Sequence, residues 1–471
     1  MLRRLGHGLV GPAGRWVAVF CGRGGWGCAW VGPGKWHDRR GGPGRRGADL
    51  DEGRTVGTGR RERTQSGARG QARARRVVRA AAGAAVAAVL AAGCSDGPPL
   101  RADSPTPSHT SGAPAAPPAT TGPASPGGTP SAAASAAPAT GTAKVDATVA
   151  SKLDSPWGMV QLADGTLLVG SRDTGRIVLV DPQKGTTTPV GTVPGVAHTQ
   201  GGEAGLLGLA LSPDFGTDHL LYAYFSTDSD NRIARMLYDP TRSPGDRLGA
   251  PDTILRGIPT GALHNGGRIA FGPDGMLYAG TGETGNRGLA QDMSSLGGKI
   301  LRMTPDGQAP PDNPTPGSLV YSPGHRNVQG LAWDGQGRLW ASEFGQDTWD
   351  ELNLIEPGKN YGWPVVEGVA HRAPYVDPVV QWHTDEASPS GIAYAAGCIW
   401  MASLKGERLW RIPLDGTKAA AAPQAFFPKT YGRLRTVIAA DDHTLLLTTS
   451  NTDGRGTPTS QDDRILRVTV T

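Results

Sequence analysis

Alternating apolar and polar residues, interrupted by short polar turns, dominate residues 143–471. Six segments repeat one pattern, in which two alternating strands flank a turn, mostly of Asp, Gly or Asn. They are residues 158–169, 206–224, 268–279, 330–341, 391–401 and 436–448. Their turns lie 45 to 62 residues apart, which leaves room for further strands, and no apolar stripe has the helical period. The pattern therefore predicts an all-β fold, a six-bladed β-propeller of four-stranded antiparallel sheets.

The register of these repeats brings polar side chains to one mouth of the central channel. The first strand of each blade lines the channel, so the residues before it share a mouth with the loop between the second and third strands. These positions hold Glu203, His264, Glu283, Arg326, Asn327, residues 343–347, Lys405, Arg433 and Arg435. The sequence thus predicts a polar pocket, built by several blades, at this mouth.

The residue types at this mouth are suited to a compact polyanion and a proton acceptor. Arginine forms bidentate contacts with carboxylates, and lysine supplies a point charge. His264 precedes two glycines and is a candidate general base at neutral pH, which Glu283 could orient. The alternatives are a structural role for His264 and solvated strand ends or hairpin tips for the cations.

Other polar groups have simpler explanations. The Asp-containing turns at 164, 274 and 334 resemble calcium loops, but hairpin chemistry explains them and they face the opposite mouth. Asp350 and Glu351 are expected to form a surface charge pair. Cys398, the only cysteine after Cys94, is expected to pack as a small apolar residue.

The N-terminal part of the chain differs in charge from the rest. Residues 1–94 contain 18 Lys and Arg against 5 Asp and Glu, whereas residues 95–471 contain 29 against 37. The basic residues lie in Gly- and Arg-rich runs without a strand or helix period, so we expect no nucleic-acid partner. Residues 1–76 are interpreted as a disordered basic leader, which a start codon assigned too early would explain.

Residues 77–94 have the features of a signal peptide. Its apolar stretch, residues 80–92, is shorter than the roughly 20 residues that span a bilayer. The end, Leu90-Ala91-Ala92-Gly93-Cys94, resembles the lipobox of bacterial lipoproteins, although Ala91 replaces the usual leucine. An ordinary signal peptide with a chance cysteine is the alternative. We expect an extracytoplasmic protein held at the membrane by a lipid on Cys94, or a secreted one if the lipobox is not used.

A tether of Pro, Ala, Ser, Thr and Gly occupies residues 95–142. It has almost no large apolar residue, so it cannot bury enough surface to offset the entropy of ordering. A disordered linker between the membrane and the propeller, residues 143–471, is the expected arrangement.

Eight short segments carry motifs of one family. They are 205–208 (GLLG), 213–215 (PDF), 264–268 (HNGGR), 297–302 (GGKILR), 324–330 (GHRNVQG), 350–353 (DELN), 360–364 (NYGWP) and 432–435 (GRLR). In this order they resemble the soluble quinoprotein glucose/sorbosone dehydrogenases and aldose sugar dehydrogenases. The resemblance runs from about residue 153 to residue 468 and covers the predicted propeller.

The resemblance implies a pyrroloquinoline quinone (PQQ) cofactor, a tricarboxylate, lying across the mouth with a calcium ion. His264 would take the proton of the sugar's anomeric hydroxyl while hydride passes to the quinone. By position, the cofactor would also be contacted or flanked by Glu203, Glu283, Arg326, Asn327, Lys405, Arg433 and Arg435.

The same resemblance implies two calcium sites. Carbonyls of Gly345 and Gln346 would bind the ion beside PQQ, which would act as a Lewis acid. Glu351 and Tyr361 match residues that hold a second, structural calcium ion in some relatives.

The sequence departs from the family pattern at several positions. Glu203 replaces a common Gln and brings a carboxylate near an anionic cofactor, which is expected to weaken binding. Leu263 replaces an acidic residue of the glucose-specific members, so a glucose-specific pocket is not expected. Residues 344–346 replace a usual His-Gly-Pro, and Glu283 keeps the carboxylate expected nineteen residues after His264.

Three functions are compatible with these observations. The first is a PQQ- and calcium-dependent aldose dehydrogenase with an unidentified external electron acceptor. The second is a non-catalytic cell-surface propeller that binds a sugar or a protein. The third is a calcium-dependent hydrolase of the lactonase type, which would need carboxylates that meet on the channel axis. The convergent cations favour the first.

Overall fold

The computed structural model describes residues 136–198 and 201–471. The chain divides into two units, Met1–Ala119 and Thr120–Thr471, and all described residues belong to the second. The basic leader, the signal peptide with Cys94 and residues 95–135 of the tether lie outside the described residues.

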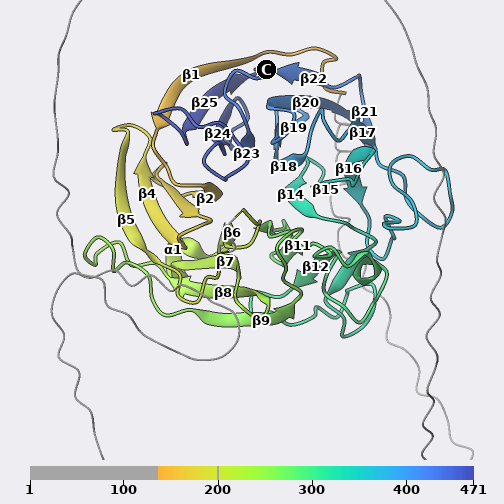
Figure 1. Cartoon of the computed structure of the whole chain (residues 1–471), viewed down its shortest axis with the longest axis horizontal. Helices are drawn as coiled ribbons and strands as arrows, with labels where there is room; N and C mark the ends of the chain where they lie inside the picture. Colours follow the sequence, from red (N-terminus) through yellow and green to blue (C-terminus); the bar gives the residue numbers. More distant parts are fainter. Residues whose placement is uncertain (1–135, 199–200) are drawn as a thin grey trace, which may run out of the picture. The chain divides into compact units, whose positions relative to one another are not determined.

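Six antiparallel sheets form a ring, so the predicted six-bladed propeller is confirmed (Figure 1). Blade 1 contains β2 (Pro156–Gln161), β3 (Leu167–Ser171), β4 (Arg176–Asp181) and β5 (Thr186–Thr192). Blade 2 contains β6 (Leu206–Leu211), β7 (Leu220–Ser226), β8 (Asn231–Leu237) and β9 (Asp252–Ile258). Blade 3 contains β10 (Ile269–Phe271), β11 (Leu277–Gly280), β12 (Lys299–Met303) and β13 (Val320–Pro323). Each predicted hairpin forms the two inner strands of its blade.

The remaining blades follow the same order, with additions at the edge of blade 5. Blade 4 contains β14 (Val328–Trp333), β15 (Leu339–Glu343), β16 (Trp349–Ile355) and β17 (Val380–His383). Blade 5 contains β18 (Pro389–Ala395), β19 (Cys398–Ser403) and β20 (Arg408–Asp415), with β21 (Lys418–Ala419) and β22 (Gln424–Phe426) both paired to β20. Helical structure among the described residues is limited to α1 (Phe215–Asp218) and a 3₁₀ turn, η1 (Arg287–Ala290).

The sixth blade joins the two ends of the propeller. It combines β23 (Leu434–Asp441), β24 (Thr444–Thr449) and β25 (Ile465–Val470) with the outer strand β1 (Ala143–Ala150). The repeats did not reveal this closure. Residues just before β1, assigned to the tether from composition, also contact the propeller: Ala137 is buried, and the buried Arg411 donates to the carbonyls of Pro138 and Thr471.

The innermost strands pack around the channel and close the ring. β2 contacts β6 and β23, β10 contacts β6 and β14, and β18 contacts β14 and β23. Glycine permits this close approach: a side-chain carbon at Gly330 on β14 would lie 2.5 Å from the carbonyl oxygen of Ser390 on β18. The ring therefore holds the residues before these strands in fixed relative positions.

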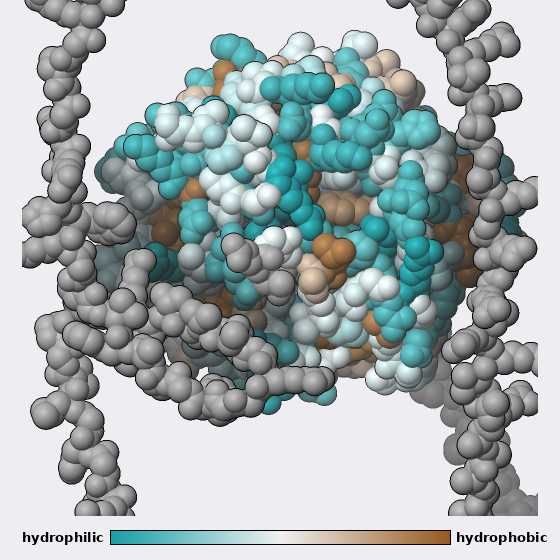
Figure 2. Space-filling view, in the orientation of Figure 1, coloured by the Kyte–Doolittle hydropathy of each residue, from teal (hydrophilic) through white to brown (hydrophobic). Residues whose placement is uncertain are grey.

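Six apolar clusters, one between each pair of neighbouring blades, form the core. Cys398 is buried in one of them with a free thiol, as predicted. One face of the molecule is mainly hydrophilic, with hydrophobic residues exposed in small patches (Figure 2). No helix among the described residues is long and apolar enough to span a membrane.

Candidate active site

A polar cavity of about 280 Å³ opens at the mouth that the repeats single out. Residues from all six blades line it: Trp157, Arg172, Glu203, His264, Arg326, Gln329, Phe344, Gly345, Gln346, Asp350, Thr384, Ser388, Leu404, Lys405, Arg433, Arg435 and Arg455. Eight of the twelve predicted propeller site residues are among them. Glu283 and Asn327 lie behind the wall and contact wall residues or their neighbours, whereas Glu351 and Tyr361 do not line this cavity.

The imidazole of His264 is held by a buried carboxylate. Its Nδ1 lies 2.6 Å from Oε1 of Glu283, in the loop that follows β11. With Nδ1 donating to Glu283, Nε2 is the acceptor on a ring that lines the cavity. The backbone of His264 has φ of 53°, an uncommon conformation for a residue with a side chain. This geometry presents a fixed imidazole to a bound ligand.

A second carboxylate, that of Glu203, fixes the backbone of His264. Its Oε2 accepts the N–H of His264 at 2.9 Å, and its Oε1 lies 2.7 Å from Nη1 of Arg455. Burial is the largest single influence on Glu203 and opposes its ionisation, but the charge and hydrogen bond of Arg455 together with the N–H of His264 outweigh it, so the pKa of Glu203 is lowered. The carboxylate that replaces the common Gln is thus paired with a cation, which reduces its repulsion of an anionic ligand.

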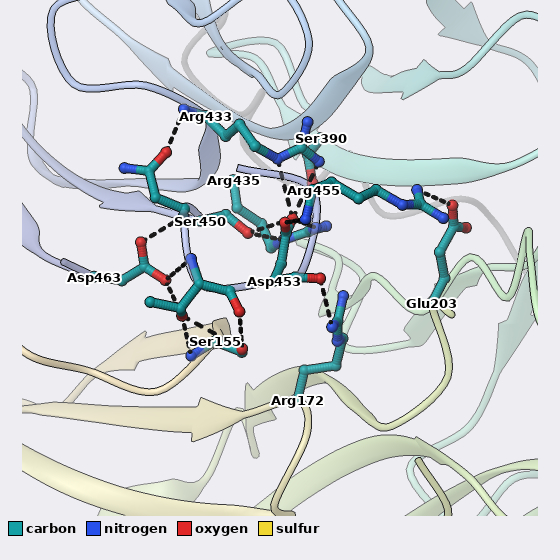
Figure 3. A network of polar contacts seen from close by, with 12 residues as sticks. Ser155, Arg172, Glu203, Ser390, Arg433, Arg435, Ser450, Asp453, Arg455 and Asp463 are labelled. Atoms are coloured by element: carbon teal, nitrogen blue, oxygen red, sulfur yellow. Dashed lines mark hydrogen bonds and ion pairs between the residues drawn. The ribbon is translucent and has the colours of Figure 1, made fainter. Parts of the chain in front are cut away.

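Arg433 and Arg435 share one buried carboxylate (Figure 3). Oδ2 of Asp453 accepts bonds from Nε and Nη2 of Arg433 and from Nη2 of Arg435, all between 3.1 and 3.2 Å. Burial raises the pKa of Asp453, yet the two guanidinium groups outweigh burial and lower it to about 2. Two cations against one anion leave a net positive charge on this wall.

Other cations near the cavity have no carboxylate partner among the described residues. Arg326 donates from Nη1 to the carbonyl of Phe344, while its buried Nε has no acceptor. Burial lowers the pKa of Arg326. Lys405 is exposed, with no bond from Nζ in the described part of the chain. Arg268 lies against Trp157, with its guanidinium carbon 4.3 Å from the ring centre. The cavity therefore has an excess of positive charge, suited to a multiply charged anion.

The donor set fits the tricarboxylate that the motifs imply. Two buried nitrogens beside the cavity lack partners, Nε of Arg326 and Nδ2 of Asn327. Unpaired buried donors are costly unless a ligand satisfies them. Asn327 is itself fixed, because its Oδ1 accepts the N–H of Gly266. Arg326, Asn327, Lys405, Arg433 and Arg435 could thus hold a planar polyanion with carbonyl oxygens.

The loop between β15 and β16 fits a calcium ion beside that ligand. The carbonyls of Gly345 and Gln346 accept no hydrogen bond within the described part of the chain, and both residues line the cavity. Free carbonyl oxygens are ligands that calcium prefers.

The second predicted calcium site, at Glu351 and Tyr361, stays a prediction, and the polar groups of both side chains have protein partners. The carboxylate of Glu351 accepts bonds from Asn353 and Gly368, and the hydroxyl of Tyr361 donates to the carbonyl of Leu354 and accepts the N–H of Glu356. No group of three or more His, Cys, Asp and Glu side chains in residues 136–198 and 201–471 is placed to hold a metal.

The prediction of a surface charge pair at Asp350 and Glu351 is wrong, because both residues are buried. Asp350 lines the cavity and accepts the N–H groups of Gly345 and Ser388. Burial raises the pKa of Asp350 to about 7, and burial together with Glu343 raises the pKa of Glu351 to about 8.

Two arginines of the cavity were missed in the sequence. Arg172 follows the second strand of blade 1 and Arg455 follows the second strand of blade 6. These are the register positions that identified Glu283 and Lys405, so the same rule applied to every blade would have found them.

The family model for glucose/sorbosone dehydrogenase matches residues 153–466, which is most of the propeller. The chain belongs to the glucose/sorbosone dehydrogenase family. Its structure is similar to the PQQ-bound aldose sugar dehydrogenase of Streptomyces coelicolor, with 64% identity, a TM-score of 0.71 and coverage of 71% of this chain and 100% of that one.

Two named dehydrogenases align with the chain over shorter segments. Quinoprotein glucose dehydrogenase B of Acinetobacter calcoaceticus is 32% identical over 283 residues, which are 53% of this chain and 59% of that protein. Aldose sugar dehydrogenase YliI of Escherichia coli is 36% identical over 225 residues, covering 45% of this chain and 60% of that protein. The matched segments thus span less than two thirds of either relative.

Proposed function

We propose that the protein oxidises aldose sugars at the anomeric carbon with bound PQQ and calcium. The observation that carries the proposal is the meeting, in one cavity, of an excess of cations with the fixed imidazole of His264. Neither a passive sugar-binding surface nor a hydrolase requires positive charge of this kind. The relatives named above as quinoprotein and aldose sugar dehydrogenases support the same chemistry.

In the proposed reaction, His264 acts as the general base. Glu283 accepts the Nδ1 hydrogen, which leaves the lone pair of Nε2 to accept a proton, and would stabilise the imidazolium that forms. Nε2 receives the proton of the anomeric hydroxyl, and a hydride leaves the anomeric carbon, so the sugar becomes a lactone. PQQ, when bound, supplies the two-electron acceptor. Glu203 holds the His264 backbone in place during this transfer.

The cations of the cavity bind and orient the acceptor. Arg433, Arg435 and Lys405 would pair with its carboxylates, while Arg326 and Asn327 would donate to its carbonyl oxygens. Calcium bound at Gly345 and Gln346 would act as a Lewis acid. Because these donors are preorganised, they would favour an acceptor that gains negative charge.

We also propose that the protein is an extracytoplasmic lipoprotein anchored through Cys94, with residues 95–135 as its tether. The proposal rests on the sequence of the signal segment. A lipid-anchored dehydrogenase would deliver electrons to an external acceptor at the membrane.

Reconstitution with PQQ and calcium tests the enzymatic proposal. The wild-type protein is expected to reduce an artificial dye with aldoses. His264→Ala should bind PQQ within about threefold of the wild-type affinity but lose at least about 100-fold in kcat, the usual scale for loss of a general base. His219→Ala, exposed at the opposite end of blade 2, is the matched control.

Each failure has a distinct meaning. Turnover that persists in His264→Ala would show that His264 is not the general base, but would leave the proposed dehydrogenase activity in place. Wild-type protein that is inactive at saturating PQQ and calcium would favour the alternative of a non-catalytic binding propeller.

A further inference from the structure

The peptide N–H groups of residues 345–349 all donate to one of two carboxylates. Gly345 donates to Oδ1 of Asp350 at 2.9 Å. The next four residues donate to a single oxygen, Oε1 of Glu367, at distances of 2.8, 3.3, 3.1 and 3.0 Å for residues 346, 347, 348 and 349. The loop thus curves around the carboxylate of Glu367, which accepts four consecutive N–H groups.

Glu367 belongs to the long connection between β16 and β17, outside the cavity wall. Its position is fixed by its neighbours: Gly368 donates to Oε1 of Glu351, and Val369 donates to Oε1 of Gln381. The carboxylate is half-buried, and charged acceptors form stronger hydrogen bonds than neutral ones. The 345–349 loop therefore has a fixed anchor in blade 4.

This anchor determines where two carbonyls point. A peptide unit is planar and trans, so its N–H and C=O point in opposite directions. The N–H of Gln346 shares a peptide unit with the carbonyl of Gly345, and the N–H of Asp347 shares one with the carbonyl of Gln346. Because both N–H groups face Glu367, both carbonyls face away from it. They are the two carbonyls that fit calcium.

The loop is wound too closely for a side chain at its start. A carbon added to Gly345 would collide with the carbonyl of Trp349 and lie 2.7 Å from Oε1 of Glu367. Glycine at position 345 thus allows the loop to approach the carboxylate of Glu367 this closely.

We propose that Glu367 is a positioning residue for the calcium ion of the active site. It does not ligate the ion; it holds the N–H groups of residues 346–349 so that the carbonyls of Gly345 and Gln346 are preorganised as ligands. The inference rests on the proposed function, since it assumes calcium binding at this loop. Loss of the anchor should weaken calcium binding and, through it, the binding of PQQ.

The test is a calcium titration of chelator-stripped protein in the presence of PQQ. Isothermal titration calorimetry measures calcium affinity, and the cofactor's absorbance gives the calcium concentration for half-maximal PQQ binding. Glu367→Ala should weaken calcium at least tenfold, and Glu367→Gln, which keeps one acceptor oxygen, should weaken it at least threefold. At saturating calcium both variants should bind as much PQQ as wild type.

Glu356→Gln is the matched control. Glu356 lies on the same connection, is exposed, and its carboxylate accepts no hydrogen bond among the described residues, so calcium affinity should not change. If Glu367→Ala does not fold, Glu367→Gln decides the question.

Calcium affinity within twofold of wild type in the folded Glu367 variants would overturn the positioning role and leave the proposed function intact. Wild-type protein that takes up neither calcium nor PQQ would refute the proposed function and this inference together.

Discussion

Replacing Asp453 by Asn should destabilise the propeller by an amount that depends on pH. The carboxylate of Asp453 is buried. Asn has a side chain of similar shape and keeps one acceptor oxygen, so the substitution mainly removes the negative charge that Arg433 and Arg435 share. The pKa near 2, against the usual 3.8, corresponds to about 2.4 kcal/mol of stability at pH 7. We expect Asp453→Asn to lose about this much.

The sign of the pH dependence follows from the lowered pKa. A carboxyl group whose pKa falls on folding contributes fully above its unfolded value and loses that contribution as pH falls through the folded value. Of the contribution that the Asp453 carboxylate makes to stability at pH 7, about 1.3 kcal/mol should remain at pH 3. The difference between wild type and Asp453→Asn should therefore shrink by about half between these pH values.

Urea unfolding followed by circular dichroism measures this difference, converted to free energy by linear extrapolation. The control is Asp246→Asn, because Asp246 is exposed and its carboxylate accepts no hydrogen bond in the described part of the chain. A difference that stays constant from pH 7 to pH 3, or a variant as stable as wild type at pH 7, would refute the electrostatic argument.

Two further predictions concern a buried lysine and the lipid anchor. Burial lowers the pKa of Lys299 to about 8, so as pH rises the folded state loses this proton before the unfolded state does. The stability of the wild type should therefore rise between about pH 8 and pH 10, whereas that of Lys299→Met should not. Urea midpoints that change in parallel in the two proteins would contradict this prediction. When cells that produce the protein are grown with radioactive palmitate, the wild-type protein should be labelled and Cys94→Ser should not. Wild-type protein that stays unlabelled would refute the lipoprotein proposal.

Most of the fold could be predicted from the sequence because each blade begins with a local hairpin. The alternation in residues 158–169 and its five counterparts sets strand, turn and strand within about a dozen residues. Closure of the ring could not be predicted in this way, since Ala143 pairs with Val470 at the other end of the propeller. Such a pairing depends on the completed ring rather than on local pattern.

The site was predictable where the register of a strand alone decides the position of a side chain. His264 and Arg326 precede first strands and reach the cavity for that reason. Asp350 and Glu367 were not recognised, because their positions depend on how the connections around β16 fold back. Adjacent acidic residues in a sequence resemble a solvated surface until the N–H groups that they accept are known.

The two ends of the propeller are neighbours, since the N–H of Thr471 donates to the carbonyl of Thr142 and the N–H of Thr142 donates to the hydroxyl of Thr471. A short peptide joining them, with a new opening cut in an exposed loop elsewhere, would give a circular permutant with all six sheets preserved. Fusion partners or electrode linkers could then leave the molecule from any blade without disturbing the cavity.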